Sequence, residues 1–377
     1  MARSNRAHAM LQAAADAAAL AAGAEMGKSS GGNGDAMDQL AATVVEKYIA
    51  ANNISAAVDS IESVTAFVDQ DKGSLTVRIQ GRMKTSLMRL AGIESMELDV
   101  SAEVAFGSKA LEIVLVLDNT GSMDGQKIND LKVAAHGLVK TVFAQQSNYS
   151  DLKVGVVPYA EYVNIGTSLK NNGWMEKDMV PSNAVWRGCV GSRQSPSDEI
   201  VKKGGPHKYV AVGDVPCGAE VLPLVSNQTL VDAKIDEMSA KGNTYIPAGL
   251  LWGWNVLDSD DPIDGGMTES QMRKSGGQKA IVLMTDGENT ISPTYPFHNG
   301  GDRAYSDALT AKLCANAKAE NIQIYTVAFQ VPSEAIKTLL KSCASEPSMA
   351  FDAGDAVALN SAFDAIGDRL ANLYLSK

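Results

Sequence analysis

The sequence has few of the features that mark membrane-spanning proteins. It contains no apolar run of about eighteen or more residues, so no segment is long enough to cross a bilayer as an apolar helix. The N-terminal stretch also lacks the strongly apolar centre of a signal peptide, because Asp16 interrupts it. We therefore expect any membrane anchor to lie upstream of this sequence or to be absent.

Basic residues are in the minority, which excludes a second class of partner. The 377 residues carry 33 Lys and Arg against 44 Asp and Glu, a formal net charge of -11. Such a chain repels nucleic acid and anionic lipid, so neither is expected as a direct partner. The length is sufficient for two domains, and 45% apolar and 20% charged residues are typical of globular proteins.

Cysteine is also scarce, and its spacing excludes a structural zinc site. The four cysteines, Cys189, Cys217, Cys314 and Cys343, include no C-x-x-C pair. Pairing each with its neighbour in sequence would close two loops, as suits an oxidising compartment such as a bacterial periplasm. Four buried free thiols remain an equal alternative on this evidence.

The first part of the chain, residues 1–108, predicts a small α+β domain. Alanine dominates residues 6–26, which favours a helix, and GKSSGGNG at 27–34 predicts a flexible linker before a second helix over 35–52. Between residues 60 and 106, apolar and polar residues alternate in VTAFVD, SLTVRIQGRMKTS and MELDVSAEVAF. That period predicts half-buried antiparallel strands.

Residues 109–377 have the pattern of a mostly parallel α/β sheet flanked by helices. Continuous apolar runs predict strands buried on both faces, and helical spacing between them predicts the covering helices. The predicted strands are EIVLVLD (112–118), KVGVVPYA (153–160), KAIVLMTD (279–286) and IQIYTVAF (322–329), with EYVNIG (161–166) antiparallel beside the second. Helices are expected near 128–142, 231–239, 247–257 and 355–375, and surface insertions near 167–227 and 288–304.

Oxygen-bearing side chains follow two of these strands and one loop. Asp118 ends the first strand and precedes Asn-Thr-Gly-Ser-Met, Asp286 ends a later strand, and Thr244 lies in KGNTYIPAG. Ligands bind outside the carboxyl ends of strands in open parallel sheets. Asp118, Thr120, Ser122, Thr244 and Asp286 supply only carboxylates and hydroxyls, a set suited to Mg²⁺, Mn²⁺ or Ca²⁺ and unsuited to zinc or copper. Two carboxylates held close also repel each other without a cation.

Other interpretations of these segments are available. Separately, DNTGS and TDGEN are ordinary turn sequences with capping residues, and only their occurrence in order with Thr244 favours a metal site. Asp118 with Asp286 is also compatible with a hydrolase, although no further base or second metal cluster is visible. GAEMGKS (23–29) is one residue short of a phosphate-binding loop and follows a predicted helix, where such a loop follows a strand.

The D-x-T-x-S segment, the later Thr and the TDG segment resemble the metal ion-dependent adhesion site of von Willebrand factor A (VWA) domains. The resemblance covers about residues 110–377. It implies a Rossmann-like VWA fold in which Asp118, Thr120, Ser122, Thr244 and Asp286 hold the cation directly or through water. It also implies a protein partner that offers an acidic side chain to the cation. Thr120 stands where many members have Ser, and it keeps the oxygen.

A second resemblance concerns most of the chain. The segments LQAAADAAALAAGA, LVLDNTGSM, VPYAEYVNIG, GLLWGWNVL, VLMTDGENT and LSK are similar to those of TadG-type proteins of bacterial tight-adherence (Flp/Tad) pilus assembly. This implies a pilin-like N-terminal domain and a VWA domain in the periplasm or at the cell surface. It also implies anchoring to the inner membrane through a segment that this sequence lacks. In that compartment we expect the disulfides Cys189–Cys217 and Cys314–Cys343.

Together these features predict a divalent-metal-dependent protein-binding module, not an enzyme, that acts in the assembly, anchoring or adhesion of a pilus. One alternative is a structural periplasmic scaffold with a fold-stabilising cation. The others are a metal-dependent hydrolase and an accessory subunit of an ATPase complex.

Overall fold

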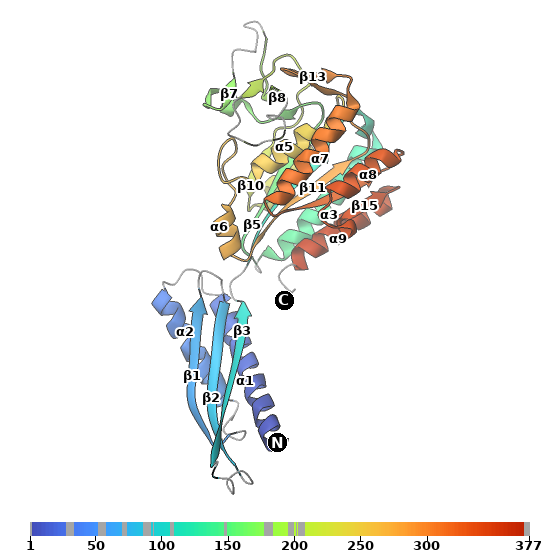
Figure 1. Cartoon of the computed structure of the whole chain (residues 1–377). Coiled ribbons are helices and arrows are strands. Elements are labelled where there is room, and N and C mark those ends of the chain that lie inside the picture. The colour runs from blue at the N-terminus through green and yellow to red at the C-terminus, as the bar shows by residue number, and fades with distance from the viewer. Residues whose placement is uncertain are drawn as a thin grey trace. The chain divides into compact units, whose positions relative to one another are not determined.

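The computed structural model divides the chain into two compact units (Figure 1). The first is Met1–Ser108 with Arg273–Gly276, and the second is Lys109–Met272 with Gly277–Lys377. The described residues are 2–27, 34–51, 58–69, 74–85, 92, 94–105, 109–146, 149–176, 184–194, 200, 202 and 208–372. Most of the predicted linker at 27–34 and parts of the insertion at 167–227 lie outside them. Within the described ranges, no helix combines the length and hydropathy that a bilayer span requires.

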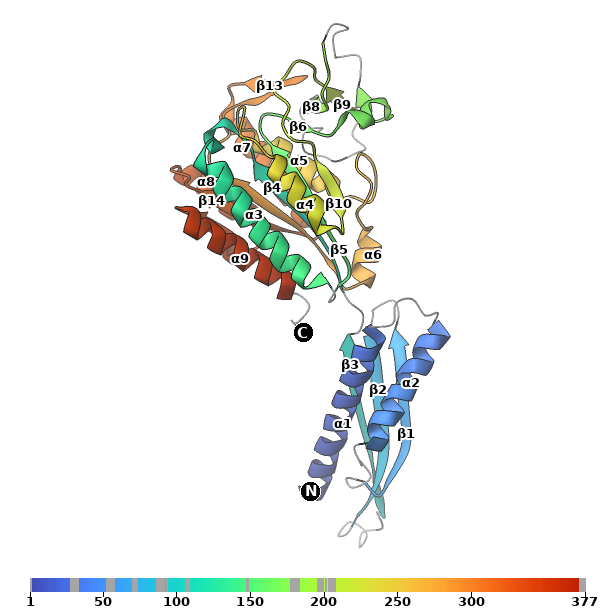
Figure 2. The same ribbon diagram turned by 180° about the vertical axis from the view of Figure 1, so that it is seen from behind.

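The first unit packs two helices on one face of a three-stranded antiparallel sheet (Figures 1 and 2). The helices are α1 (Ala2–Gly27) and α2 (Gly34–Ala51), and the strands are β1 (Ser60–Asp69), β2 (Ser74–Lys84) and β3 (Ser95–Ala105). Alanine favours the helical conformation of α1. Because its side chain is small, the face of α1 that packs on the sheet is narrow. The side chains of that face include Leu11, Ala15, Ala18 and Ala22.

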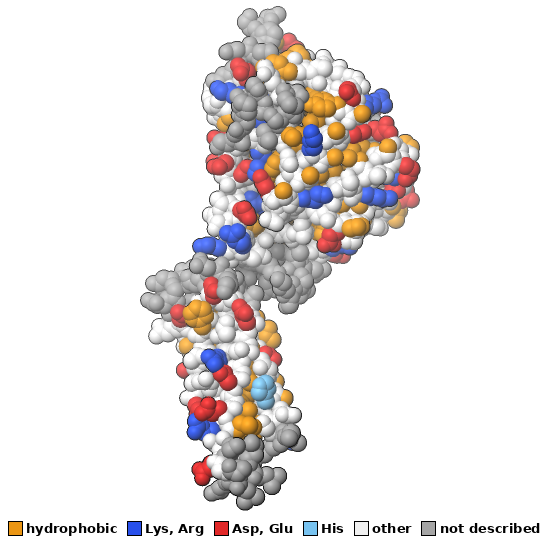
Figure 3. Space-filling view, viewed as in Figure 1, with side chains coloured by type: hydrophobic (Ala, Val, Ile, Leu, Met, Phe, Trp, Pro, Cys, Tyr) orange, Lys and Arg blue, Asp and Glu red, His pale blue; other side chains and the backbone are white. Residues whose placement is uncertain are grey.

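The two faces of this sheet differ as the alternation in the sequence predicts. Leu75, Val77 and Ile79 of β2 are buried under the helices. The opposite face carries cross-strand ion pairs, including Arg82 Nε to Glu62 Oε1 at 2.6 Å. Figure 3 shows acidic and basic side chains mixed on this face. The predicted half-buried antiparallel meander is therefore confirmed.

The second unit is built on a six-stranded sheet in the order β10-β5-β4-β11-β14-β15. Five strands run parallel and β10 is antiparallel to its neighbour β5, so the predicted mostly parallel α/β sheet is confirmed. The strands are β4 (Lys109–Asp118), β5 (Tyr149–Tyr159), β10 (Leu222–Val225), β11 (Gln278–Thr285), β14 (Ile322–Phe329) and β15 (Ala350–Ala353).

Helices cover both faces of this sheet (Figures 1 and 2). On one face, Val114 and Val116 of β4 pack with α5 (Ile246–Val256), α7 (Arg303–Ala319) and α8 (Glu334–Cys343). On the other, Leu115 and Leu117 pack with α3 (Gln126–Ala144), α4 (Gln228–Glu237) and α9 (Ala356–Asn372). A further short helix is α6 (Glu269–Lys274). Burial of alternate β4 residues on two sides explains its unbroken apolar sequence.

Two small sheets lie outside the central one. One has the order β6-β8-β9-β7, and the other is the hairpin β12-β13. Their strands are β6 (Val163–Asn164), β7 (Met175–Glu176), β8 (Cys189–Gly191), β9 (Tyr209–Ala211), β12 (Ser292–Thr294) and β13 (Phe297–Gly300). The predicted pairing of residues 161–166 beside β5 is wrong, because β6 pairs with β8 and β10 takes the place next to β5.

All four cysteines form disulfides. Cys189 of β8 is joined to Cys217, and Cys314 of α7 is joined to Cys343 of α8. The second disulfide is buried between its two helices and not in a surface loop. It therefore links covalently two of the helices that cover one face of the sheet.

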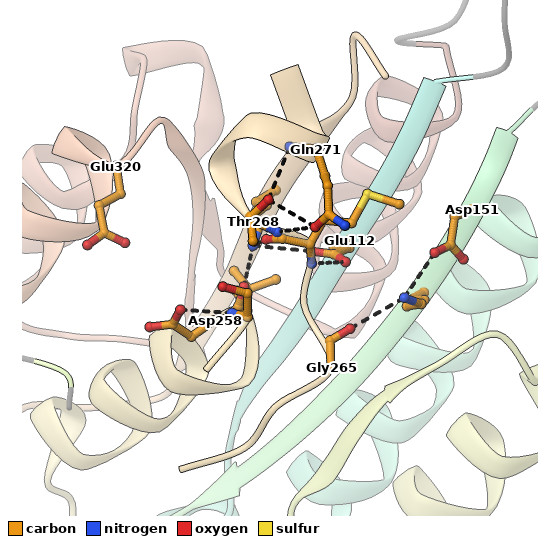
Figure 4. Close-up of polar contacts among 12 residues, drawn as sticks. Glu112, Asp151, Asp258, Gly265, Thr268, Gln271 and Glu320 are labelled. Atoms are coloured by element: carbon orange, nitrogen blue, oxygen red, sulfur yellow. Dashed lines mark hydrogen bonds and ion pairs between the residues drawn. The ribbon is translucent and has the colours of Figure 1, made fainter. Parts of the chain in front are cut away.

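A buried ion pair lies at the edge of the central sheet where the parallel strands begin (Figure 4). Glu112 of β4 has a fully buried side chain, and its Oε2 lies 3.3 Å from Lys279 Nζ of β11. The Met267 N–H donates to Glu112 Oε1 at 2.7 Å, and Lys153 Nζ donates to the Gly265 carbonyl at 3.3 Å. Burial raises the pKa of Glu112, and the charge of Lys279 opposes that rise. These contacts hold residues 265–267 against three strands.

Replacing Lys279 with Met leaves the Glu112 carboxyl buried without its counter-ion. We expect Lys279→Met to lower the free energy of unfolding by about 3–5 kcal/mol, the usual cost of breaking a buried pair from one side. The double variant Glu112→Gln with Lys279→Met removes the charge and keeps an acceptor for Met267, so it should recover more than half of the loss. Urea denaturation measures both values. Equal losses in the single and double variants would contradict this role.

His298 of β13 is buried between two aromatic rings. Its ring centroid lies 5.0 Å from that of Tyr162 and 4.4 Å from that of Tyr245. Nδ1 donates to the Glu161 carbonyl oxygen at 2.5 Å. Burial lowers the pKa of His298 to about 4, and the hydrogen bond to Glu161 opposes this decrease. The imidazole is therefore neutral in the folded protein at neutral pH.

The pKa of His298 predicts a loss of stability in mild acid. The unfolded chain takes up a proton on this histidine below its ordinary pKa of about 6.5, whereas the folded chain does so only near pH 4. The free energy of unfolding should therefore fall by about 3 kcal/mol across this window because of His298 alone. We expect His298→Phe to lack that part of the decrease, measured by urea denaturation at several pH values. Parallel curves for the two proteins would refute the assignment.

Candidate metal centre

The carboxyl ends of β4 and β11 bring two aspartates together. The strands are parallel neighbours, and their register sets Asp118 and Thr285 at the same edge of the sheet. Asp118 Oδ2 accepts a hydrogen bond from Thr285 Oγ1 at 2.8 Å and one from the Asp286 N–H at 3.4 Å. Asp118 Oδ1 accepts from the Thr120 N–H at 2.8 Å. Strand register alone therefore makes these two acidic residues neighbours.

Two hydroxyls connect the aspartates. After β4 the chain forms a single 3-10 turn over Gly121–Met123, which carries Ser122 toward the end of β11. Thr120 Oγ1 lies 2.9 Å from Ser122 Oγ, and Ser122 Oγ donates to Asp286 Oδ1 at 2.6 Å. Asp118, Thr120, Ser122 and Asp286, four of the five predicted ligands, thus form one hydrogen-bonded cluster.

Thr244, the fifth predicted ligand, lies beside this cluster in the loop between α4 and α5. The Gly121 N–H donates to the Gly242 carbonyl at 2.9 Å, which joins this loop to the turn after β4. Gly242 has a φ of 92°, a conformation that glycine adopts most readily. Thr244 is buried, and its N–H donates to Thr290 Oγ1 at 2.8 Å. Within the described residues, no hydrogen bond joins its hydroxyl to the other four.

The cluster combines deep burial with like charges. Asp118 is fully buried, and burial raises its pKa to about 6, with the charge of Asp286 adding to that rise. Hydrogen bonds from Thr120 and Thr285 lower the pKa in part. Lys127 of α3 places its Nζ 2.8 Å from Asp286 Oδ2, an ion pair in which the Asp286 side chain has no exposed surface. The ammonium of Lys127 therefore pairs with one of the two carboxylates.

The chemistry of these donors fits a hard divalent cation. The atoms available are carboxylate and hydroxyl oxygens, the ligands that Mg²⁺, Mn²⁺ and Ca²⁺ prefer. Ser122 is exposed, whereas Asp118, Thr120, Thr244 and Asp286 are buried, so the cluster has a side that solvent reaches. In the described part of the chain, no three His, Cys, Asp or Glu side chains gather as a metal-binding group. A cation here would therefore depend on hydroxyl oxygens as well as the two carboxylates.

Several residues around the cluster were not predicted from the sequence. Lys127 is separated from Asp286 by more than half of the second unit. Its one local signal is that a basic residue stands in the first turn of a helix, where the helix dipole disfavours it.

Two further residues support the cluster from other strands and loops. Tyr159, at the end of β5, donates to the Met284 carbonyl at 3.1 Å and lies 3.5 Å from Asp118 Oδ2. Glu161 Oε2 accepts from Asn243 Nδ2 at 2.7 Å and so anchors the Thr244 loop. No sequence pattern marks the last two contacts.

Comparisons with known proteins identify similar structures but no family. No family model and no curated protein matches the chain. The pilus adhesin SpaC of Lactobacillus rhamnosus GG is 14% identical, with a TM-score of 0.44, over 83% of this chain and 34% of SpaC. The vWF domain of the type V pilus tip protein Mfa5 of Porphyromonas gingivalis is 12% identical (TM-score 0.43), over 72% of this chain and 97% of that one.

The adhesive tip pilin GBS104 of Streptococcus agalactiae is 13% identical, with a TM-score of 0.45, over 69% of this chain and all of that one. The match thus spans about a third of the length of SpaC, 97% of the Mfa5 vWF domain and all of the GBS104 chain. At these TM-scores the likenesses carry no argument about function. The α/β fold described above rests on the strand order and register of the chain itself.

Proposed function

We propose that the second unit binds a divalent cation through Asp118, Thr120, Ser122, Thr244 and Asp286, and that the cation holds an acidic side chain of a protein partner. The observation that carries this proposal is the single hydrogen-bonded cluster formed by Asp118, Thr120, Ser122 and Asp286. Side chains from two separate strands meet there, at the sheet edge where α/β proteins bind ligands.

The charges of the cluster support a cation. The two carboxylates belong to one hydrogen-bonded cluster, in which the Asp286 N–H donates to Asp118, and only Asp286 forms an ion pair with Lys127. A divalent ion relieves this repulsion, because it stabilises both ionised carboxylates at once. Mg²⁺ is the first choice, with Mn²⁺ and Ca²⁺ as alternatives, since each takes oxygen ligands.

The exposed position of Ser122 supports a partner as the source of a further ligand. The buried aspartates hold the cation from the sheet side, while the Ser122 side faces solvent. Hydroxyl ligands add oxygen atoms without adding charge, so the bound cation keeps affinity for one more carboxylate. A carboxylate on another protein is the natural ligand for that position. Binding of this kind requires no catalytic base, and we infer a binding protein and not an enzyme.

The setting we infer is the assembly, anchoring or adhesion of a bacterial pilus of the tight-adherence kind. It rests on the resemblance of LVLDNTGSM, VPYAEYVNIG and VLMTDGENT to TadG-type proteins. The two disulfides agree with a periplasmic or surface location, where thiols are oxidised. A pilus or cell-envelope component is accordingly the expected partner, and the same resemblance supports association with the inner membrane.

Isothermal titration calorimetry with Mg²⁺ and Mn²⁺ tests the metal site directly. We expect the wild-type chain to bind either ion and Asp118→Ala to lose binding, because Asp118 is the buried carboxylate on which the cluster is centred. Asp130→Ala is the matched control: Asp130 lies in α3 near the site but bonds only to Gln126 in the described structure. Equal titration curves for wild type and Asp118→Ala would refute the site.

Partner capture tests the second half of the proposal. Immobilised wild-type chain should retain a pilus or envelope protein from the source cell in Mg²⁺ and release it in EDTA, and Asp118→Ala should retain none. A different result would favour a scaffold in which the cation only stabilises the fold. In that case the wild-type chain binds the metal, but the partner is retained equally in EDTA and by Asp118→Ala.

A further inference from the structure

Lys127 is the residue at this site that the proposed ligand set does not account for. It is the second residue of α3, where the positive end of the helix dipole disfavours a basic side chain. Its Nζ lies 2.8 Å from Asp286 Oδ2, and the Lys127 side chain is 28% exposed. The ion pair with a fully buried carboxylate explains why the ammonium group is stable there.

Asp286 divides its two oxygens between different partners. Oδ1 accepts from Ser122, a proposed ligand, and Oδ2 accepts from Lys127. Any cation held by Asp118, Thr120 and Ser122 must therefore share the Asp286 carboxylate with an ammonium group that is already in contact with it. The two positive charges compete for one acceptor, and they also repel each other across a short distance in a partly buried site.

We propose that Lys127 is a counter-ion of Asp286 that weakens divalent-cation binding and stabilises the Asp286 carboxylate when no cation is bound. This inference rests on the proposed metal site and adds a residue that sets its affinity. A divalent cation alone would neutralise the two carboxylates, whereas the cation and Lys127 together leave one positive charge in excess. That excess lowers the affinity for the metal and raises the affinity of the loaded site for an acidic side chain.

The test compares Lys127→Met with wild type in the full-length chain. Titration calorimetry with Mg²⁺ should give a dissociation constant about 10- to 100-fold lower for Lys127→Met, the range over which neighbours of metal ligands alter affinity. Thermal unfolding in EDTA should occur at a lower temperature in Lys127→Met, because the buried Asp286 carboxylate loses its counter-ion. The increase in melting temperature on adding Mg²⁺ should then be larger than in wild type.

Three further variants serve as controls. Lys127→Arg keeps the charge, and Lys132→Met removes a charge from the same helix at a lysine that donates to the Asp236 carbonyl. Both should bind Mg²⁺ within about threefold of wild type, because the first retains the positive charge beside Asp286 and the charge removed in the second is screened by solvent. Lys127→Gln repeats the loss of charge with a polar side chain, and it replaces Lys127→Met if that variant fails to fold.

The outcomes separate this inference from the proposed function. Unchanged or weaker Mg²⁺ binding in Lys127→Met and Lys127→Gln, with binding in wild type and none in Asp118→Ala, would overturn the role of Lys127 and leave the metal site intact. A stability loss that is equal in EDTA and in Mg²⁺ would also overturn it, because that result describes a purely structural lysine. Absence of Mg²⁺, Mn²⁺ and Ca²⁺ binding in wild type, in Lys127→Met and in Lys127→Gln would refute the metal site, and this inference with it.

Discussion

The hydrogen-bonded register of β4 and β11 is the constraint on which the site depends. Because the two strands are parallel and aligned, Asp118 and Asp286 leave the sheet at the same edge and only one residue out of step. Their apolar neighbours are buried on both faces, so neither strand can shift without exposing core side chains. The close approach of two carboxylates is thus imposed by the packing of the whole sheet. The packed core of the sheet, and not the hydrogen bonds within the cluster, therefore sets the positions of these two side chains.

The buried carboxylates at the two edges of this sheet differ in how far their charge is compensated. At the edge where strands begin, Glu112 faces Lys279 directly, and the Met267 N–H supplies a further hydrogen bond. That arrangement is balanced in charge and holds a loop in place. At the other edge, two aspartates lie together, and only Asp286 pairs with an ammonium group, that of Lys127. Buried charges without full compensation lower the free energy of unfolding, and such groups are typical of ligand-binding and catalytic sites. The contrast within one sheet is a physical reason to assign structure to one edge and function to the other.

The sequence predicted those parts of the molecule that depend on local pattern and strand direction. Unbroken apolar runs predicted the parallel strands, and Asp118 and Asp286 were predicted as site residues because each ends one of these runs. The cysteine spacing left free thiols open, and only the resemblance to periplasmic proteins favoured the disulfides that the structure contains. Long-range pairings had no such signal. The ion pair of Lys127 with Asp286, and β10 as the antiparallel neighbour of β5, arise from tertiary packing that no local period encodes.

The hydroxyls at Thr120 and Ser122 explain why the cluster would need both a lysine and a cation. Carboxylates at those positions would bind a cation more tightly, but they would cancel its charge and leave little attraction for a partner. With hydroxyls at those positions a divalent cation would balance the two aspartates, and Lys127 would leave one positive charge in excess. The same choice leaves the cluster short of positive charge without the cation, which the ammonium of Lys127 offsets only in part. If the proposed site holds a cation, this composition would lower its affinity for the metal and retain its affinity for an acidic partner.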